Sequence, residues 1–175
     1  MNIYLLGYMG CGKTKTGRRL AAYAGLPFTD LDRLFENRCG IAIADYFALH
    51  SEEEFRKAEA QLLRETALAD NRIVALGGGT PCFGDNMEWL KGHGFTVYLK
   101  MNETALLNNL CRSRKRRPLL EGLDREGTAA KIREQLPQRE QYYRQADLTC
   151  SIPPTEIPQL WETIQKQIQS KKSDE

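Results

Sequence analysis

The segment from Gly7 to Thr14, GYMGCGKT, places three glycines, a lysine and a threonine between an apolar run and a stretch of helical periodicity. Glycines let the backbone curl until successive N–H groups point into one concavity, which a phosphate group fills. Lys13 can reach the β- and γ-phosphates of a nucleotide, and the Thr14 hydroxyl is a hard ligand suited to Mg²⁺. Gly7, Gly12, Lys13 and Thr14 satisfy the pattern G-x-x-x-x-G-K-[ST], so the sequence predicts a nucleotide-phosphate site that uses Mg²⁺.

Other residues must decide the reaction, because switch GTPases, ATPases and small-molecule kinases all share this loop. The chain has no N-K-x-D guanine motif, and a D-x-x-G match at 124–127 follows a basic segment rather than an apolar strand, so we interpret it as chance. A hydrolase also needs a residue that places water, and none stands out. Cys11, inside the loop, is interpreted as a packing residue.

Two carboxylates follow one another in the segment FTDLD. Asp30 and Asp32 alternate, so in an extended segment both side chains share one side. Asp30 lies near the phosphate loop and could support Mg²⁺, whereas Asp32 could accept a hydrogen bond from a substrate hydroxyl. The alternative is purely structural: Asp32 caps a helix that begins at Arg33, and Asp30 is a turn residue beside it.

Arg56 and a triple glycine are further candidates for a site. Arg56 lies three or four residues from Glu52, Glu53 and Glu59, which is also the spacing of ordinary surface salt bridges. The glycines at 77–79 directly follow an apolar run. Three consecutive glycines cost backbone entropy on folding, which suggests that a ligand approaches the main chain there.

The segment RSRKRRPLL, residues 112–120, has five basic residues among its first six positions. Such a run could bind nucleic acid, but the net charge of only +2 and the bounded loop favour a lid over phosphates. Arg139 adds one more cation, late in a helix and beside two tyrosines.

Apolar runs that alternate with amphipathic segments predict an α/β fold in a single domain, residues 1–175. Extended segments are expected at 2–7, 26–32, 72–76, 95–101 and 148–152. Helices are expected at 13–24, 33–39, 41–50, 51–69, 102–112 and 155–170. Strands separated by helices imply a parallel sheet with helices on both faces, whose ligands bind at the carboxyl ends of the strands.

The composition narrows the classes of partner. The balanced charge gives no reason to expect nucleic acid, and no apolar stretch approaches the roughly 20 residues of a membrane span. The N-terminus enters a strand without a signal-peptide pattern. Five cysteines without CxxC spacing argue against a disulfide framework or a zinc site and for a reducing, cytoplasmic environment.

Taken in order and spacing, the motifs resemble the shikimate kinases from about Ile3 to Cys150. Six motifs carry the resemblance: the phosphate loop, F-x-D-x-D at Phe28, Asp30 and Asp32, F-R-x-x-E at Phe55, Arg56 and Glu59, the triple glycine at 77–79, R-P-L-L at 117–120 and R-E-x-x-Y at 139–143. Because many enzymes share the loop, the other five make the resemblance specific. It implies a P-loop fold like that of nucleoside-monophosphate kinases, with substrate-binding helices at about 32–60 and a lid at about 112–124.

The resemblance also implies an activity: ATP-dependent phosphorylation of shikimate to shikimate 3-phosphate in aromatic amino acid (chorismate) biosynthesis, by a cytoplasmic monomer that binds neither nucleic acid nor membrane. The implied catalytic residues are Lys13, Asp32 and Arg117. The implied ATP-binding residues are Gly10, Cys11, Gly12, Lys13, Thr14, Lys15 and Arg117, and Mg²⁺ would be held by Thr14 and, through water, by Asp30. Shikimate would be held by Asp32, Arg56, Gly78 and Arg139, with the two arginines on its carboxylate. Arg112 and the segment 151–154 are candidates for contacts with adenine.

Three positions depart from the family pattern: Lys15, Ser51 and Thr80, the last of which stands where a small apolar residue is common. Two alternatives stay open. One is a kinase for another small polyol acid such as gluconate, against which the F-R-x-x-E and R-E-x-x-Y motifs argue. The other is a regulatory module that binds nucleotide without catalysis, which would be expected to lose Lys13, Asp32 or Arg139.

Overall fold

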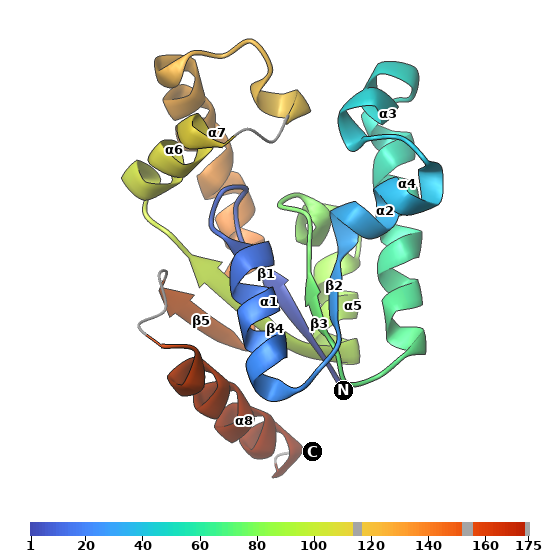
Figure 1. The fold of residues 1–175 in the computed structure, drawn as a ribbon, viewed down its shortest axis with the longest axis vertical. Helices are drawn as coiled ribbons and strands as arrows, with labels where there is room; N and C mark the ends of the chain where they lie inside the picture. The colour runs from blue at the N-terminus through green and yellow to red at the C-terminus, as the bar shows by residue number, and fades with distance from the viewer. Residues whose placement is uncertain (114–116, 152–155, 174–175) are drawn as a thin grey trace.

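Strands that are distant in sequence pair side by side in the computed structural model, which describes residues 1–113, 117–151 and 156–173 (Figure 1). Within these residues one five-stranded sheet has the order β2-β3-β1-β4-β5, and every pairing is parallel. The strands are β1 (Asn2–Leu6), β2 (Phe28–Asp30), β3 (Ile73–Ala75), β4 (Gly94–Lys100) and β5 (Leu148–Ser151). The predicted parallel α/β sheet is confirmed.

The three central strands are buried on both faces, which explains why they read as continuous apolar runs rather than as alternating ones. Leu5 pairs with both Ala75 and Val97, and Asp30 pairs with Ala75. The carboxyl ends of β1, β2 and β3 therefore meet at one edge of the sheet. The segments that follow these strands carry most of the predicted site residues.

Helices cover both faces, as predicted. The helices are α1 (Lys13–Ala24), α2 (Leu31–Cys39), α3 (Ile43–Leu49), α4 (Glu52–Glu65), α5 (Asn86–His93), α6 (Glu103–Arg112), α7 (Arg125–Tyr143) and α8 (Ile157–Ser173), with short 3₁₀ turns η1 (Thr66–Leu68), η2 (Thr80–Cys82) and η3 (Pro118–Leu120). In Figure 1, α1 and α8 pack together in front of the sheet and α5 lies behind it. Above the sheet, α2, α3 and α4 stand on one side and α6 and α7 on the other.

Local capping residues set the helix boundaries. Gly25 ends α1 in the left-handed conformation, with φ of 66°. Ser51 and Glu54 form a capping box at the start of α4, and the Asn102 side chain caps α6. The expected cap at Asp32 is wrong: Asp30 caps α2, because β2 ends there and the helix begins at Leu31. Asp32 therefore lies in the first turn of the helix instead of in an extended segment.

An aromatic cluster holds α2, α3 and α4 together. Phe35 of α2 makes edge-to-face contacts with Tyr46 of α3 and Phe55 of α4, at ring-centroid distances of 5.0 and 4.9 Å. The ring of Phe47, also in α3, lies in a tilted contact with that of Phe55, at a centroid distance of 4.8 Å. Such pairs add to the stability that burial alone provides. The cluster fixes α4, which carries Arg56, relative to α2, which carries Asp32.

The structure also shows the state of the cysteines and the character of the helices. All five cysteines lie in the described residues and are free thiols, and Cys11 is fully buried, as a packing residue should be. Among the described helices, none combines the length and the apolar character that crossing a membrane requires.

Candidate active site

Two adjoining cavities open at the carboxyl edge of the sheet, with volumes of about 680 and about 410 Å³. The larger lies between α2, α3 and α4, and the smaller lies over the phosphate loop. Both are lined by Met9, Thr14, Asp30, Asp32, Gly77, Gly78 and Arg117. Two ligands bound in these cavities would therefore meet at a shared wall of polar residues.

The phosphate loop presents the open N-terminus of α1 to the smaller cavity. Gly10 and Gly12 have φ values of 83° and 87°, which L residues with side chains rarely adopt. No side chain caps the N-terminus of α1, and its first turn has no acidic residue. The N–H groups of that turn and the helix dipole together favour an anion at this point.

Lys13 is held back against the loop that precedes it. Its Nζ donates to the carbonyl oxygens of Gly7, at 2.7 Å, and Tyr8, at 3.1 Å. The Asn109 side chain donates to the Gly10 carbonyl, at 2.9 Å, and so ties the loop to α6. Gly10, Gly12, Lys13 and Lys15 line the smaller cavity, whereas the Cys11 side chain points into the core. Cys11 could therefore reach a nucleotide only through its backbone.

Thr14 and Asp30 form the pair that could hold a metal ion. Thr14 Oγ1 donates to Asp30 Oδ2 at 2.6 Å, while the other carboxylate oxygen caps α2. In the described part of the chain no cluster of three or more His, Cys, Asp or Glu side chains offers a fuller metal site. One hydroxyl and one carboxylate fit Mg²⁺ well, because this ion keeps several waters and takes its other ligands from phosphates.

Arg56 is mostly buried, and the shorter of its two ion pairs is with a buried carboxylate. Only 12% of its side chain is exposed, and Nη1 donates to Oε2 of Glu59 at 2.8 Å, while Glu52 lies 3.6 Å from Nη2. Glu59 is almost completely buried. That burial raises the pKa of its carboxyl group, and the charge of Arg56 and hydrogen bonds from Thr80 and Arg56 oppose the rise. Arg56 thus lines the larger cavity and is held there by its ion pair with buried Glu59.

The three glycines let side chains of the site approach the backbone. A Cβ at Gly77 would lie 2.6 Å from Oε1 of Glu59, and one at Gly79 would lie 2.6 Å from Cζ of Arg56. A Cβ at Gly78 would lie 3.3 Å from Nη1 of Arg139. The close approach expected here is therefore already made by the protein's own charged side chains.

Arg139 reaches the larger cavity from α7, on the other side of the glycines. Its guanidinium lies over the Tyr8 ring, at 5.3 Å from the centroid. Tyr143, one helical turn further on, donates to the Gly78 carbonyl at 2.5 Å and so fixes α7 against the glycine segment. Arg56 and Arg139, far apart in sequence, both line this cavity.

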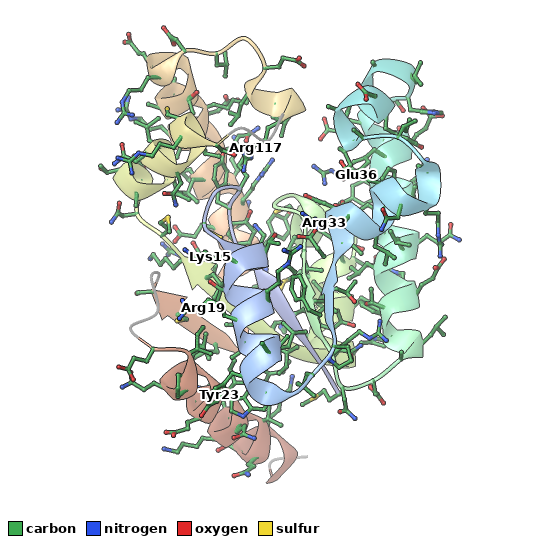
Figure 2. All side chains as sticks on the ribbon, viewed as in Figure 1. Lys15, Arg19, Tyr23, Arg33, Glu36 and Arg117 are labelled. Carbon is green, nitrogen blue, oxygen red and sulfur yellow. The ribbon has the colours of Figure 1, made fainter. Side chains whose placement is uncertain are left out.

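Arg117 lines both cavities and comes from the side opposite α2. Figure 2 shows it across the opening from Arg33 and Glu36 of α2. Its Nη1 donates to Ser113 Oγ at 2.9 Å. Burial lowers the pKa of Arg117, and the negative charge of Asp32 opposes that shift. A guanidinium placed here is suited to an anion that lies between the two cavities.

Parts of the predicted lid and adenine site lie outside the described residues. These are residues 114–116 of the basic run and 152–154 of the segment 151–154. Arg112, the exposed last residue of α6, lines the smaller cavity, as a contact with the nucleotide requires.

Sequence reasoning assigned no role to several residues of the larger cavity. Ile43, Phe47, Phe55 and Leu119 form its apolar wall, and Arg33 and Glu36 lie at α2. Thr80, noted only as a departure, donates to buried Glu59. The spacing of Glu59 from Arg56 signalled a pair, but nothing in the sequence signalled that the pair is buried.

Comparisons with known proteins show which family the chain is similar to. The family model described as shikimate kinase matches residues 9–169. A shikimate kinase of Parabacteroides distasonis is 42% identical over 147 residues, which cover 84% of this chain and 85% of that protein. The crystal structure of a shikimate kinase from Bacteroides thetaiotaomicron has a TM-score of 0.88 at 32% identity and covers 97% of this chain and 98% of that one. That of a shikimate kinase from Acinetobacter baumannii in complex with shikimate has a TM-score of 0.86 at 35% identity, covering 98% and 94%.

The loop geometry predicts that Lys13 contributes directly to the binding of phosphates. Lys13→Ala should weaken binding of inorganic triphosphate roughly 30-fold, because one charge-assisted contact contributes about 2 kcal/mol. Calorimetric titration measures this change. Arg19→Ala is the matched control, since Arg19 lies on the exposed face of the same helix (Figure 2). Equal losses in both variants would mean that bulk charge, rather than a contact by Lys13, binds the anion.

Proposed function

Because the chain belongs to the shikimate kinase family, we propose that it transfers the γ-phosphate of ATP to a secondary hydroxyl of shikimate, giving ADP and shikimate 3-phosphate. Phosphoryl transfer depends on positioning and on neutralising charge, and both cavities supply these. The observation that carries the proposal is that two arginines, Arg56 and Arg139, line a cavity that shares a wall with the phosphate loop.

Shikimate would bind in the larger cavity through its carboxylate. Arginine suits this task because its planar fork donates two parallel hydrogen bonds and stays charged at any working pH. Arg56 would approach from α4 and Arg139 from α7, on the two sides of Gly78. Asp32 would accept a hydrogen bond from the attacking hydroxyl, orient it toward the smaller cavity and take its proton as the bond to phosphorus forms.

ATP would bind with its phosphates in the smaller cavity, on the N–H groups of the loop from Gly10 to Lys15. Lys13 would leave its carbonyl partners for the β- and γ-phosphates. Thr14 and Asp30 would hold Mg²⁺, Asp30 through water, and the ion would neutralise charge on the phosphates. Arg117 lines both cavities and would meet the phosphate as it crosses between them.

The two alternatives have less support. A kinase for gluconate would not need the pair of arginines that the family motifs place in the larger cavity. A module without catalysis has no use for Lys13, Asp32 and Arg139 together, and all three line the cavities. We further propose a cytoplasmic monomer that binds no nucleic acid or membrane, which is consistent with the net charge of only +2 and with five cysteines that lack CxxC spacing.

The direct test is release of ADP with shikimate, its methyl ester or gluconate as acceptor. We expect turnover with shikimate. For the methyl ester, kcat/KM should be at least about 100-fold lower than for shikimate, because esterification removes the negative charge that both arginines are proposed to bind. Gluconate should support no more ADP release than water. If the ester is as good a substrate as the acid, the two arginines do not bind a carboxylate.

Arg56→Lys tests the geometry of that contact. A point charge cannot reproduce the planar fork, so KM for shikimate should rise about 10-fold or more while KM for ATP stays unchanged. Lys57→Ala is a control on the same helix, because Lys57 is exposed and forms its ion pair with Glu53, which is also exposed. Steady-state kinetics in both substrates measure the difference, and an unchanged KM for shikimate in Arg56→Lys would remove Arg56 from the binding site.

Gly79→Ala tests the close approach of Arg56 to the backbone. The new Cβ would displace the guanidinium of Arg56 from its place beside buried Glu59, so KM for shikimate should rise about 10-fold and stability should fall by roughly 1–3 kcal/mol. Gly92→Ala is the control, because a Cβ there meets no atom within 4 Å and should stabilise α5 by up to about 1 kcal/mol. Normal shikimate kinetics in Gly79→Ala would contradict this account of the third glycine.

A further inference from the structure

Glu59 is buried between two partners, one on each carboxylate oxygen. Oε2 accepts from Nη1 of Arg56 at 2.8 Å, and Oε1 accepts from Oγ1 of Thr80 at 2.6 Å. The side chain of Glu59 is only 2% exposed, and Thr80 is fully buried. The hydrogen bond from Thr80 thus fixes the orientation of the carboxylate, and the carboxylate in turn fixes the position of the Arg56 guanidinium.

Thr80 is itself fixed by the backbone around it. Its N–H donates to the Gly77 carbonyl at 3.2 Å, and its own carbonyl accepts from the Asn86 side chain at 2.8 Å. Asn86 is fully buried and accepts in turn from Nη1 of Arg64. The Thr80 hydroxyl therefore meets Glu59 from a rigid turn.

We propose that Thr80 is a positioning residue for the acidic substrate: its hydroxyl occupies one oxygen of Glu59 and turns the other oxygen toward Arg56, which is thereby aimed into the larger cavity. The inference rests on the proposed function, because the ligand of Arg56 is taken to be the carboxylate of shikimate. It adds a residue that touches neither substrate and acts through Glu59.

The charged surroundings of Glu59 make this contact sensitive to pH. Arg56 of α4 favours the ionised form of Glu59, and Asp32 of α2 disfavours it. The thiol of Cys82, just after the glycine segment, interacts electrostatically with Glu59 and with Arg139 of α7. Burial raises the pKa of Glu59 above its ordinary value, against the charge of Arg56 and the hydrogen bond from Thr80. Loss of the Thr80 hydroxyl would raise this pKa further, and a protonated Glu59 would no longer hold Arg56 by charge.

The raised pKa of Glu59 also makes the stability of the protein depend on pH. A carboxyl group whose pKa is raised by folding costs stability as pH rises from its ordinary pKa through the raised one, because the ionised form must then be buried. A variant without the hydroxyl should therefore be less stable than the wild type at neutral pH. Its deficit should shrink near pH ~4, where Glu59 is protonated in both proteins.

The test compares Thr80→Val, which keeps the shape and removes the hydroxyl, with Thr80→Ser, which keeps the hydroxyl. Thr80→Val should raise KM for shikimate roughly 5- to 10-fold near pH ~7.5 and move the acid limb of kcat/KM for shikimate upward by about one pH unit. KM for ATP should change less than about 2-fold, and Thr80→Ser should restore the shikimate kinetics. Melting temperatures of all three proteins between pH ~4 and ~8 provide a readout without substrate.

The experiment distinguishes failure of the proposed function from failure of the role given to Thr80. A wild-type protein that releases no ADP with shikimate contradicts the proposed function. Normal turnover in the wild type, with the same KM and acid limb in Thr80→Val, overturns the role of Thr80 alone, and so does a Thr80→Ser variant as impaired as Thr80→Val. If Thr80→Val does not fold, Thr80→Ala replaces it: this variant also lacks the hydroxyl and should raise KM for shikimate and move the acid limb upward, and an unchanged KM and acid limb overturn the inference.

Discussion

The contact of Glu59 with Arg56 is the interaction on which the charged wall of the larger cavity depends. A carboxylate and a guanidinium are taken out of water beside a backbone of three glycines, and the desolvation of each is offset by the other and by Thr80. Such a pair contributes little net stability, but removal of one member leaves a buried charge that costs several kcal/mol. The pair fixes the orientation of the Arg56 side chain, because Arg56 cannot turn into solvent without leaving the buried charge of Glu59 unpaired.

The parallel sheet explains why this pair lies beside the phosphate loop. β1 and β3 are neighbours and run in the same direction, so the loop after β1 and the glycines after β3 emerge at the same edge. β2 pairs with β3 on its other side and delivers Asp30 and Asp32 to that edge. A ligand at this point is thus contacted by residues from three separate parts of the chain, and no local motif contains the whole site.

Local patterns predicted what local physics determines. The phosphate loop and the strands of the central sheet could be identified from the sequence, because glycine conformations and apolar runs act over a few residues. The burial of Arg56 could not, because the same i,i+3 spacing to Glu59 occurs on exposed helices and only the packing of α4 against the glycine segment distinguishes the two. The boundary of α2 was misplaced for a related reason: Asp30 and Asp32 are both good capping residues, and the end of β2 decides between them. Thr80 looked like a neutral departure, since its value lies in a contact with a residue twenty-one positions earlier.

Sharing of residues between the two cavities couples the two ligands physically. Asp32, Gly78 and Arg117 line both, whereas Arg56 lines only the larger and Lys13 only the smaller. An anion in either cavity would change the electrostatic field at Arg117, whose charged form is favoured by Asp32 and disfavoured by burial. A phosphate at the shared wall would relieve that cost, and it would do so most fully while the group passes between the cavities. In the proposed reaction, charge placed at the boundary rather than deep in either cavity would favour the transferring phosphate over either bound ground state, which is the condition for accelerating the chemical step.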